Sequence, residues 1–398
     1  MADDAILVAG GGLGGLAVAL ALGKQGRRVR VLEQTAELGA IGYGIQLGPN
    51  VFPMFERLGL VDAVLARSII PRACIMFDAL TGAEVTRIPG EAALRKRFGG
   101  PYIVIHRVDL HGVLLDACKE LGISLEPLTS VASFEQDDAG VLVTTDDGRR
   151  IEGAALIGAD GLRSAVRDQI VNDGEPKPIG YVAHRTILPI DRVPDGVQKD
   201  ISALWIGPGF HLVHYPLRHD ELFNIVAVFR TGSYGEKGDL DFHAAEVERT
   251  YRTAHPLIKS MLALMDLNRR WVIADRDPVR HWSQGRVTIL GDAAHPALQT
   301  FAQGACMAIE DAVTLASCVG QDRDFAAAFR AYEKARLVRT ARVQLEGRSM
   351  WEGYHADGIA RDVWLQTFAR DERAICECLA WLYDGVTLPG TNARISAA

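Results

Sequence analysis

The first 33 residues contain the pattern that most restricts what this chain can fold into. An apolar run at residues 5–9 ends in GGGLGG, in which Gly10, Gly12 and Gly15 fit the pattern GxGxxG. An apolar stripe typical of a helix follows, and the next apolar run ends at Glu33, 18 residues after Gly15. A buried strand, a glycine turn, a helix and a second strand with an acidic end predict a Rossmann-like unit that binds a dinucleotide.

Each part of this pattern has a physical reason. Gly12 and Gly15 are expected to bind the cofactor, because glycine permits the tight turn and lets the backbone approach a pyrophosphate closely. The helix N-terminus offsets the phosphate charge, and Glu33 stands where an acid grips the adenosine ribose. The pattern alone does not distinguish NAD from FAD, and a glycine turn without a ligand is the alternative interpretation.

Two later segments also deliver a carboxylate to the end of a predicted buried strand. Residues 154–159 lead to Asp160, and residues 287–290 lead to Asp292, a loop and a helix that begins near Gly304. An aspartate at such a position can simply cap a helix, but the repetition favours a shared ligand. The helix N-terminus at Gly304 offers free N–H groups and a positive dipole end to an anionic group.

The residues between these strand ends follow a different pattern. Short β-branched and aromatic runs alternate with Gly, Pro and Asp, which predicts an antiparallel sheet. Its expected strands are residues 181–190, 202–206, 210–216 and 224–230, joined by residues 74–88. If both carboxylates serve one cofactor, this sheet is inserted into the nucleotide-binding unit.

We therefore expect an α/β protein of interleaved domains. The Rossmann-like domain is formed by residues 1–73, 105–180 and 271–340, the antiparallel-sheet substrate domain by residues 74–104 and 181–270, and a helical C-terminal region by residues 341–398. A long amphipathic helix, residues 325–350, is expected either to cover the nucleotide-binding domain or to meet a second subunit. Residues 39–48 are expected to form a glycine-rich loop.

One basic residue lies at a predicted junction of strand and helix. Residues 102–106 are expected to form a strand and residues 110–121 a helix, with Asp109 as its N-cap. Arg107 lies between them, where its side chain would reach a phosphate. A surface salt bridge is the alternative interpretation.

Composition excludes several classes of protein. The 398 residues carry 43 basic and 50 acidic side chains without a long run of one sign, so nucleic acid is not an expected partner. The acidic start MADDAILVAGGG lacks the features of a signal peptide or a membrane span, which predicts a cytoplasmic protein without integral membrane association. The six cysteines form no CxxC pair, so we expect reduced thiols and no metal site.

Taken together, three stretches resemble the group A flavoprotein aromatic hydroxylases, which share the para-hydroxybenzoate hydroxylase fold. The stretches are GGGLGG with Glu33, ADGLRSAVR at residues 159–167 and GDAAHP at residues 291–296. By this resemblance FAD is held by Gly12, Gly15, Glu33, Arg107 and Asp292, while the stretch at Asp160 is associated with both FAD and the pyridine nucleotide. The chain departs from the family pattern at Ala302 and Cys306, where many members have Gly and Asn.

The resemblance also implies the chemistry. NADH reduces FAD, reduced FAD takes up O₂ to form a C4a-hydroperoxide, and this species hydroxylates a phenol. With a single GxGxxG occupied by FAD, NADH is expected to bind only transiently. The stretches GGPYIVIHRVDLH, HLVHYPL and HPALQ resemble members that convert 3-hydroxybenzoate into gentisate (2,5-dihydroxybenzoate), by hydroxylation para to the hydroxyl group. A small aromatic acid is thus the expected substrate, and a homodimer the expected assembly.

The candidate catalytic residues lie on the strand expected at residues 210–216. Alternation with period 2 puts His211, Val213 and Tyr215 on one face. Our hypothesis is that His211 acts as general base on the substrate hydroxyl, suited by a pKa near neutrality, although a purely structural histidine is the commoner case. By the resemblance, Gln299 holds the same oxygen, and Tyr215 or Tyr102 contacts the ring or carboxylate.

Three alternatives stay open. Salicylate 1-hydroxylase and 6-hydroxynicotinate 3-monooxygenase are decarboxylating relatives with the same motifs, and release of carbon dioxide separates them. An NAD-dependent dehydrogenase would lack yellow colour after purification. A flavin-binding module without turnover would bind FAD but show no phenol-stimulated NADH oxidation.

Overall fold

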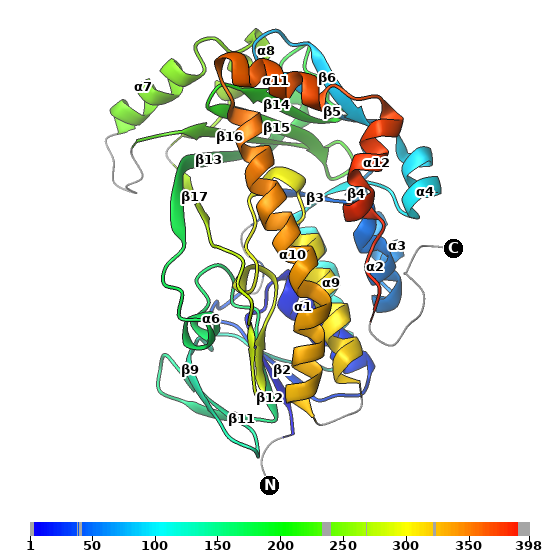
Figure 1. Ribbon diagram of the computed structural model, residues 1–398, viewed down its shortest axis with the longest axis vertical. Coiled ribbons are helices and arrows are strands. Elements are labelled where there is room, and N and C mark those ends of the chain that lie inside the picture. The colour runs from blue at the N-terminus through cyan, green and yellow to red at the C-terminus, as the bar shows by residue number, and fades with distance from the viewer. Residues whose placement is uncertain are drawn as a thin grey trace.

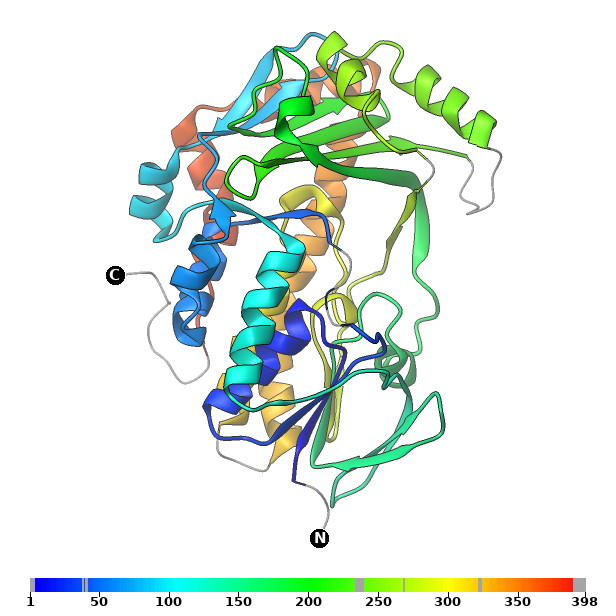
Figure 2. The same cartoon turned by 180° about the vertical axis from the view of Figure 1, so that it is seen from behind.

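The computed structural model describes residues 4–37, 39, 42–232, 240–267, 269–320 and 324–388. Figures 1 and 2 show an elongated molecule with a parallel sheet toward one end and a largely antiparallel sheet at the other. A long helix, α10 (Phe325–His355), runs alongside both. The expected α/β class, with a Rossmann-like unit, an interleaved antiparallel sheet and a helical C-terminal part, is confirmed.

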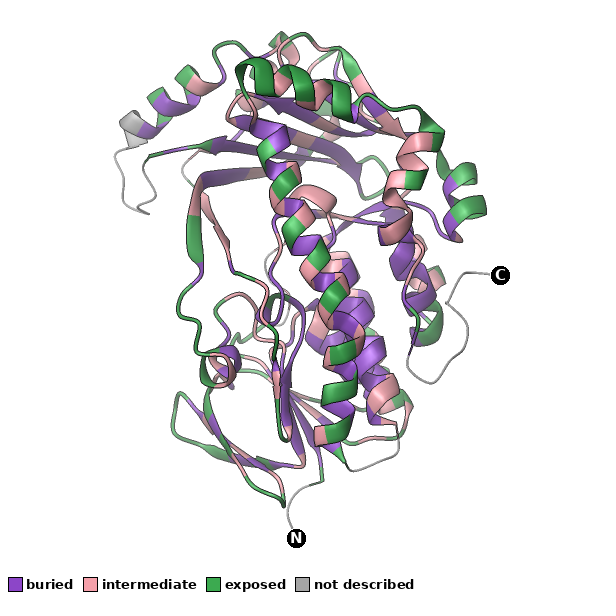
Figure 3. Cartoon of the chain, viewed as in Figure 1, coloured by how far each residue is buried: buried purple, intermediate pink, exposed green. Residues whose placement is uncertain are grey.

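Apolar strands form the centre of the parallel sheet. Its spatial order is β18 (Ser283–Gln284), β19 (Val287–Ile289), β12 (Ala155–Gly158), β1 (Ile6–Ala9), β2 (Val29–Leu32) and β8 (Ser124–Glu126). The strands from β19 to β8 run parallel, and every residue of β1 and β12 is buried (Figure 3), as expected for a parallel sheet that is covered on both faces. The covering helices include α1 (Leu13–Lys24), α5 (Arg107–Glu120) and α9 (Gly304–Val319).

The antiparallel sheet is made of the strands expected from the alternating runs. Its spatial order is β17 (Trp271–Asp275), β13 (Lys177–Pro189), β16 (Leu222–Arg230), β15 (Phe210–Leu217), β14 (Ser202–Gly207), β5 (Cys74–Asp78) and β6 (Glu84–Ile88). Neighbouring strands are antiparallel except β14 and β5, which are parallel. Residues 74–88 therefore join the sheet, as expected.

The two faces of this sheet differ. One face packs its apolar side chains, such as Phe210 and Leu212, against α7 (Leu240–Thr250) and α8 (Pro256–Leu262). The opposite face carries His211, Val213 and Tyr215 and faces a cavity. Alternating residues of β15 therefore face a packed hydrophobic core on one side of the sheet and an open cavity on the other.

The remaining described elements are smaller. Two further sheets have three strands each: β9 (Val131–Gln136), β10 (Val141–Thr145) and β11 (Arg150–Gly153) form one, and β3 (Gly44–Leu47), β7 (Ile103–His106) and β4 (Ser68–Ile69) form the other. The short helices are α2 (Phe52–Leu58), α3 (Val61–Leu65), α4 (Glu91–Phe98) and α6 (Ala165–Ile170). The 3₁₀ turns are η1 (Pro49–Val51), η2 (Ile190–Arg192), η3 (Gly291–Ala293) and η4 (Gln299–Phe301).

Two local predictions are wrong. The expected loop at residues 39–48 contains strand β3, because its backbone pairs with β7; residues 40 and 41 lie outside the described part. The helix after β7 begins at Arg107, three residues before the expected first helical residue, Leu110. The N-cap is His106, whose Nδ1 accepts the N–H of Val108, while Asp109 pairs with Arg218.

The C-terminal part consists of α10 followed by α11 (Gly358–Phe368) and α12 (Glu372–Tyr383). Helix α10 contacts α9 at one end and strands β14 and β15 at the other, so it ties the two sheets together. Residues 389–398 of the expected C-terminal region lie outside the described residues. The domain boundaries stay a prediction. Among the described helices, none is both long and apolar enough to span a membrane.

Candidate active site

Three strand ends meet at one edge of the parallel sheet. Strand β12 lies between β1 and β19, with Gly158 paired to Ala9 on one side and to Ile289 on the other. Because all three strands are parallel, the glycine turn after β1, Asp160 after β12 and Asp292 after β19 leave the sheet at the same edge. The two carboxylates, far apart in sequence, therefore lie at one edge of the sheet, and their sharing of one ligand stays a prediction.

The glycine turn leaves open space where a pyrophosphate is expected. A Cβ atom added at Gly12 would meet no heavy atom within 4 Å, and Gly12 caps α1 without a side-chain hydrogen bond. A Cβ at Gly15 would lie 1.9 Å from the carbonyl oxygen of Gly10, so α1 and β1 pack too closely there for any other residue. Gly12 thus keeps the N-terminus of α1 accessible, and Gly15 lets the helix approach the strand.

Two carboxylates at this edge are set for a ligand. Glu33 accepts the backbone N–H of Gly11 at 2.7 Å and that of Thr35 at 2.8 Å, which fixes it beside the turn. Asp160 accepts the N–H of Val166 at 3.3 Å through Oδ2, but its buried Oδ1 has no hydrogen-bond partner within the described part of the chain. Burial raises the pKa of Asp160. A buried oxygen without a hydrogen-bond donor destabilises the protein, so a ligand that donates a hydrogen bond to Asp160 Oδ1 would be favoured here.

Asp292 and the start of α9 lie side by side. A Cβ added at Gly304 would lie 3.9 Å from Asp292 Oδ1, and the helix has no side-chain cap. The carboxylate is exposed to the hollow yet surrounded by protein, and this enclosure raises its pKa, opposed by the charges of His295 and Arg107. The backbone N–H of Arg107 donates to the carbonyl oxygen of Tyr43 at 2.9 Å, which fixes the start of α5 beside β3.

A buried network holds the turn that carries Asp292. Asp311 on α9 accepts the N–H of Gly291 at 3.0 Å and bonds to His295 Nε2 at 2.5 Å, and Arg336 on α10 donates to its other oxygen at 2.6 Å. Burial disfavours the charged carboxylate, but His295 and Arg336 outweigh it and lower the pKa of Asp311 far below its usual value. Through Asp311, η3 is held to both α9 and α10.

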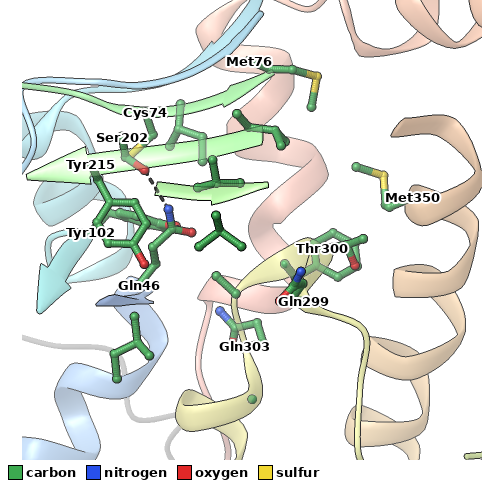
Figure 4. Close-up of a pocket in the computed structure, with 18 of the residues that line it drawn as sticks. Gln46, Cys74, Met76, Tyr102, Ser202, Tyr215, Gln299, Thr300, Gln303 and Met350 are labelled. Carbon is green, nitrogen blue, oxygen red and sulfur yellow. Dashed lines mark hydrogen bonds between the residues drawn. The ribbon is translucent and has the colours of Figure 1, made fainter. Parts of the chain in front are cut away.

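A cavity of about 450 Å³ lies between this edge and the inner face of the antiparallel sheet. Its lining brings together seven of the predicted residues: His211, Val213, Tyr215, Tyr102, Gln299, Asp292 and Gly304. Figure 4 shows Tyr215, Tyr102 and Gln46 grouped at one side, with Gln299, Thr300 and Gln303 on the facing wall. The other predicted cofactor residues, Gly12, Gly15, Glu33, Arg107 and Asp160, lie outside this lining.

The strand register explains the sheet side of the lining. Val213 pairs with Val226 on β16 and with Leu204 on β14, and Val226 pairs with Arg185 on β13. Cross-strand partners share a face, so this row points into the cavity together. Gly44 on β3 completes the wall, because a Cβ there would lie 2.4 Å from the Tyr215 ring. Only glycine therefore fits at this position beside the Tyr215 ring.

The polar groups of the lining form short chains. The Tyr102 hydroxyl donates to Gln46 Oε1 at 3.0 Å, and Gln46 Nε2 donates to Ser202 at 2.8 Å. Arg185 Nη2 donates to Gln299 Oε1 at 2.9 Å. Burial raises the pKa of Tyr215, so this phenol stays a hydrogen-bond donor.

The environment of His211 differs from the expectation. Its ring is 3% exposed, and Nδ1 lies 2.8 Å from Nε2 of His355. Burial lowers the pKa of His211 well below its usual value, so the expected pKa near neutrality is wrong. The cause is desolvation by two packed elements, β15 and α10, which a strand pattern cannot reveal. The ring is neutral at physiological pH and able to accept a proton only as a weakened base.

Sequence reasoning missed Arg185, Gln46 and His355. Alternation along residues 181–190 would have put Arg185 on the pocket face of its strand, since it lies two residues from Ala183 and Ile187. His355 and Gln46 had no comparable signal, because their partners come from other elements. Ala302, where many family members have Gly, has φ 54° and ψ 36°, a left-handed conformation that explains the family preference for glycine.

These residues fit FAD. The open glycine turn, the fixed Glu33, the unpaired oxygen of Asp160 and the uncapped N-terminus of α9 are groups that would contact the ribose, phosphates and flavin ring. The described residues show no group of His, Cys, Asp and Glu suited to a metal ion. All six cysteines are free thiols.

Comparison with known proteins agrees with this geometry. Residues 3–343 match the family model described as FAD binding domain. The 3-hydroxybenzoate 6-hydroxylase of Polaromonas naphthalenivorans (strain CJ2) is 43% identical over 96% of both chains, and that of Klebsiella oxytoca is 42% identical over 90% of both. The crystal structure of HpxO from Klebsiella pneumoniae complexed with FAD and uric acid has a TM-score of 0.84, at 28% identity, over 96% of this chain and 97% of that one.

An FAD-binding family model spanning most of the chain, relatives above 40% identity that are hydroxylases, and the geometry of the three strand ends lead to one conclusion. This chain belongs to the FAD-dependent group A aromatic hydroxylases and is an aromatic monooxygenase.

Proposed function

We propose that the enzyme hydroxylates 3-hydroxybenzoate para to its hydroxyl group, at carbon 6, and forms 2,5-dihydroxybenzoate. The reaction consumes one NADH, one proton and one O₂, and yields NAD⁺ and water besides the product. The observation that carries the proposal is the cavity in which His211 and Gln299 lie with Asp292 and Gly304. Relatives bearing this activity in their names, at 42–43% identity, support the choice of substrate.

FAD, when bound, takes two electrons from NADH and activates the O₂ whose atom enters the ring. Gly12, Gly15, Glu33, Arg107, Asp160, Asp292 and Gly304 would hold it. The uncapped N-terminus of α9 at Gly304 would offer its N–H groups to negative charge on the flavin ring. The remaining tasks belong to the substrate side of the cavity.

His211 would accept the phenolic proton. Loss of that proton pushes electron density onto the ring carbons ortho and para to the oxygen, and carbon 6 is the para position. The neutral ring required of an acceptor is present, because burial keeps His211 unprotonated. Gln299 would hold the same oxygen through its amide N–H group, since its Oε1 already accepts from Arg185.

Arg185 would bind the substrate carboxylate. It lines the cavity on the same face as Val213, and its hydrogen bond to Gln299 uses one of its five N–H donors. Burial lowers the pKa of its guanidinium, an unfavourable environment that a carboxylate relieves. Tyr215 and Tyr102 would contact the ring, and Val213 would fill the space beside it.

The proposal is tested with purified protein loaded with FAD. NADH consumption is followed with a panel of hydroxybenzoates, and the products are separated by chromatography. We expect stimulation by 3-hydroxybenzoate and formation of 2,5-dihydroxybenzoate without carbon dioxide. Carbon dioxide released from salicylate or 6-hydroxynicotinate would instead identify the decarboxylating alternative. A comparison of NADH with NADPH in the same assay tests the expected co-substrate.

We also propose a homodimer and a cytoplasmic location. Exposed apolar side chains on α10 (Val338 and Leu345) and α11 (Ile359 and Val363) are consistent with a contact between subunits. Light scattering of the purified protein measures the assembly, and a monomeric mass at micromolar concentration would contradict it.

A further inference from the structure

The proposed base forms a hydrogen-bonded chain with a second histidine. His211 lies on β15, and His355 is the last residue of α10, whose upper end in Figure 1 reaches the antiparallel sheet. The distance from His211 Nδ1 to His355 Nε2 is 2.8 Å, and that from His355 Nδ1 to the carbonyl oxygen of Trp351 is 2.7 Å. Both residues are almost fully buried, with exposed fractions of 3% and 5%.

The carbonyl oxygen of Trp351, at the end of this series of hydrogen bonds, fixes which ring nitrogen of each histidine carries the hydrogen. A carbonyl oxygen only accepts, so His355 Nδ1 carries a hydrogen and donates it to Trp351. Burial lowers the pKa of His355 to about 3, so its ring is neutral, has a single N–H group and leaves Nε2 as an acceptor. His211 Nδ1 must then donate to His355. The neutral ring of His211 therefore has its lone pair on Nε2.

We infer that His355 is a positioning residue that holds His211 in the Nδ1–H tautomer, so that Nε2 is free to accept the phenolic proton of the substrate. This inference rests on the proposed function. The phenolic O–H bond breaks, its electron pair stays on the substrate oxygen, and the proton forms an N–H bond at His211 Nε2. The Nδ1–H group keeps donating to His355 throughout, so no further proton moves.

His355 selects a tautomer without making His211 a strong base. Among the described residues, no carboxylate forms a hydrogen bond or ion pair with either ring. The other ionisable side chains packed against the pair are Tyr181, Tyr251, Tyr354 and Arg230. A neutral partner provides no negative charge to stabilise an imidazolium, in contrast to the carboxylate of a Ser-His-Asp triad.

The direct test is the tautomer of His211 in the FAD-loaded enzyme. Nitrogen NMR of protein labelled with ¹⁵N-histidine distinguishes Nδ1–H from Nε2–H rings, and loss of a resonance in His211→Asn assigns it. We expect the Nδ1–H form in the wild type and in His355→Gln, whose amide offers a donor to Trp351 and an acceptor to His211. In His355→Leu we expect a shift toward the Nε2–H form. An unchanged tautomer in His355→Leu would overturn the inference.

The second readout is the pH dependence of hydroxylation. With the acceptor nitrogen of His211 no longer fixed, His355→Leu should lower the hydroxylation rate at pH 7 roughly ten- to hundredfold. The loss should shrink as pH rises toward the ionisation of free phenols near pKa 10, because the substrate then arrives without its proton. His355→Gln should stay within about threefold of the wild type. A loss in His355→Leu that is independent of pH would indicate a purely structural role.

A matched control lies on the same strand. His214 is buried on the opposite face of β15, and neither of its ring nitrogens has a hydrogen-bond partner within the described residues. His214→Leu removes a buried histidine of the same strand and should leave the tautomer of His211 and the pH profile unchanged. Failure of this inference can be distinguished from failure of the proposed function. The ¹⁵N resonance of His211 tests the role of His355, whereas the absence of 2,5-dihydroxybenzoate from the wild-type reaction would refute the proposed function.

Discussion

The site has two walls, the edge of the parallel sheet and the inner face of the antiparallel sheet, and they are built from different parts of the chain. The edge of the parallel sheet presents mostly backbone: a glycine turn, helix N-termini and carboxylates at strand ends. The inner face of the antiparallel sheet presents side chains, with His211, Val213 and Arg185 set by alternation and register. The first wall suits a cofactor common to a family, and the second suits a particular substrate. Substitutions at the two walls should therefore fail in different ways.

The largest effect is expected at the glycine turn. Gly15→Val places a side chain where even a Cβ would lie 1.9 Å from Gly10, so we expect a loss of unfolding free energy of about 3 kcal/mol or more and little bound FAD. Urea unfolding and the flavin absorbance of the purified protein measure both.

Gly12→Ala is the matched control for Gly15→Val. Its backbone, at φ −73° and ψ −174°, suits alanine, and the added Cβ meets no atom within 4 Å. We expect stability within about 1 kcal/mol of the wild type but FAD affinity lowered roughly tenfold or more, because the methyl group occupies the approach to the pyrophosphate. Equal FAD affinity in Gly12→Ala and the wild type would show that the cofactor does not lie over this turn.

On the substrate wall, His211→Ala should leave FAD bound. Reduction of FAD by NADH should then proceed without hydroxylation of the substrate. Loss of a general base costs roughly a hundredfold or more in rate, so NADH oxidation should continue with release of hydrogen peroxide and little product. Peroxide and 2,5-dihydroxybenzoate are quantified in the same reaction. Normal coupling in this variant would remove His211 from the mechanism.

Arg185→Met tests the carboxylate contact. A hydrogen bond to a charged group contributes about 1.5 to 3 kcal/mol, so KM for 3-hydroxybenzoate should rise roughly ten- to a hundredfold. Binding of 3-methylphenol, which lacks the carboxylate, should change far less. An equal loss for both ligands would assign Arg185 to the wall itself through its hydrogen bond to Gln299.

Acid should lower the unfolding free energy of the protein through His214, on the apolar face of β15. Burial lowers the pKa of His214 to about 3, whereas an unfolded histidine has a pKa near 6.5. Below pH 6.5 the unfolded chain binds the proton and the native chain does not, so stability falls by about 1.4 kcal/mol per pH unit from this group until its folded pKa is reached. His214→Leu should reduce the slope between pH 6 and 4 by that amount in urea titrations. An unaltered slope would mean that His214 is protonated in the native state.

The smallest effect is expected at Ala302, between the two walls. Its left-handed backbone, at φ 54°, costs alanine about 1 kcal/mol relative to glycine. Ala302→Gly should therefore raise the unfolding free energy by roughly that amount. A decrease would show that the alanine methyl group makes contacts that outweigh the strain.

The same contrast between the walls explains what could be predicted from the sequence. Glycine and aspartate at strand ends are required by backbone geometry, so GGGLGG, Asp160 and Asp292 predicted the cofactor edge and its convergence. Alternation with period 2 predicted the face that His211 and Tyr215 share. The partners of those residues could not be predicted, because His355 lies 144 residues from His211 and the pKa of His211 depends on how α10 buries it.

Errors at element boundaries have local causes. Asp109 fits the usual preference for an N-cap, but His106 caps the helix three residues earlier with its ring nitrogen. The glycines at residues 39–48 suggested a loop, yet Gly44 lies in a strand because its backbone pairs with β7, and it is a glycine because the ring of Tyr215 occupies the space of a side chain. In both places a tertiary contact overrides the residue preference.

The central claim is that the phenol lies between FAD at the parallel-sheet edge and His211 on the antiparallel sheet. A crystal structure of the enzyme with FAD and 3-hydroxybenzoate tests it most directly. We predict the substrate hydroxyl within hydrogen-bond distance of His211 Nε2 and its carboxylate at Arg185. A phenol bound with its hydroxyl away from His211, or FAD bound away from Asp292, would contradict the account.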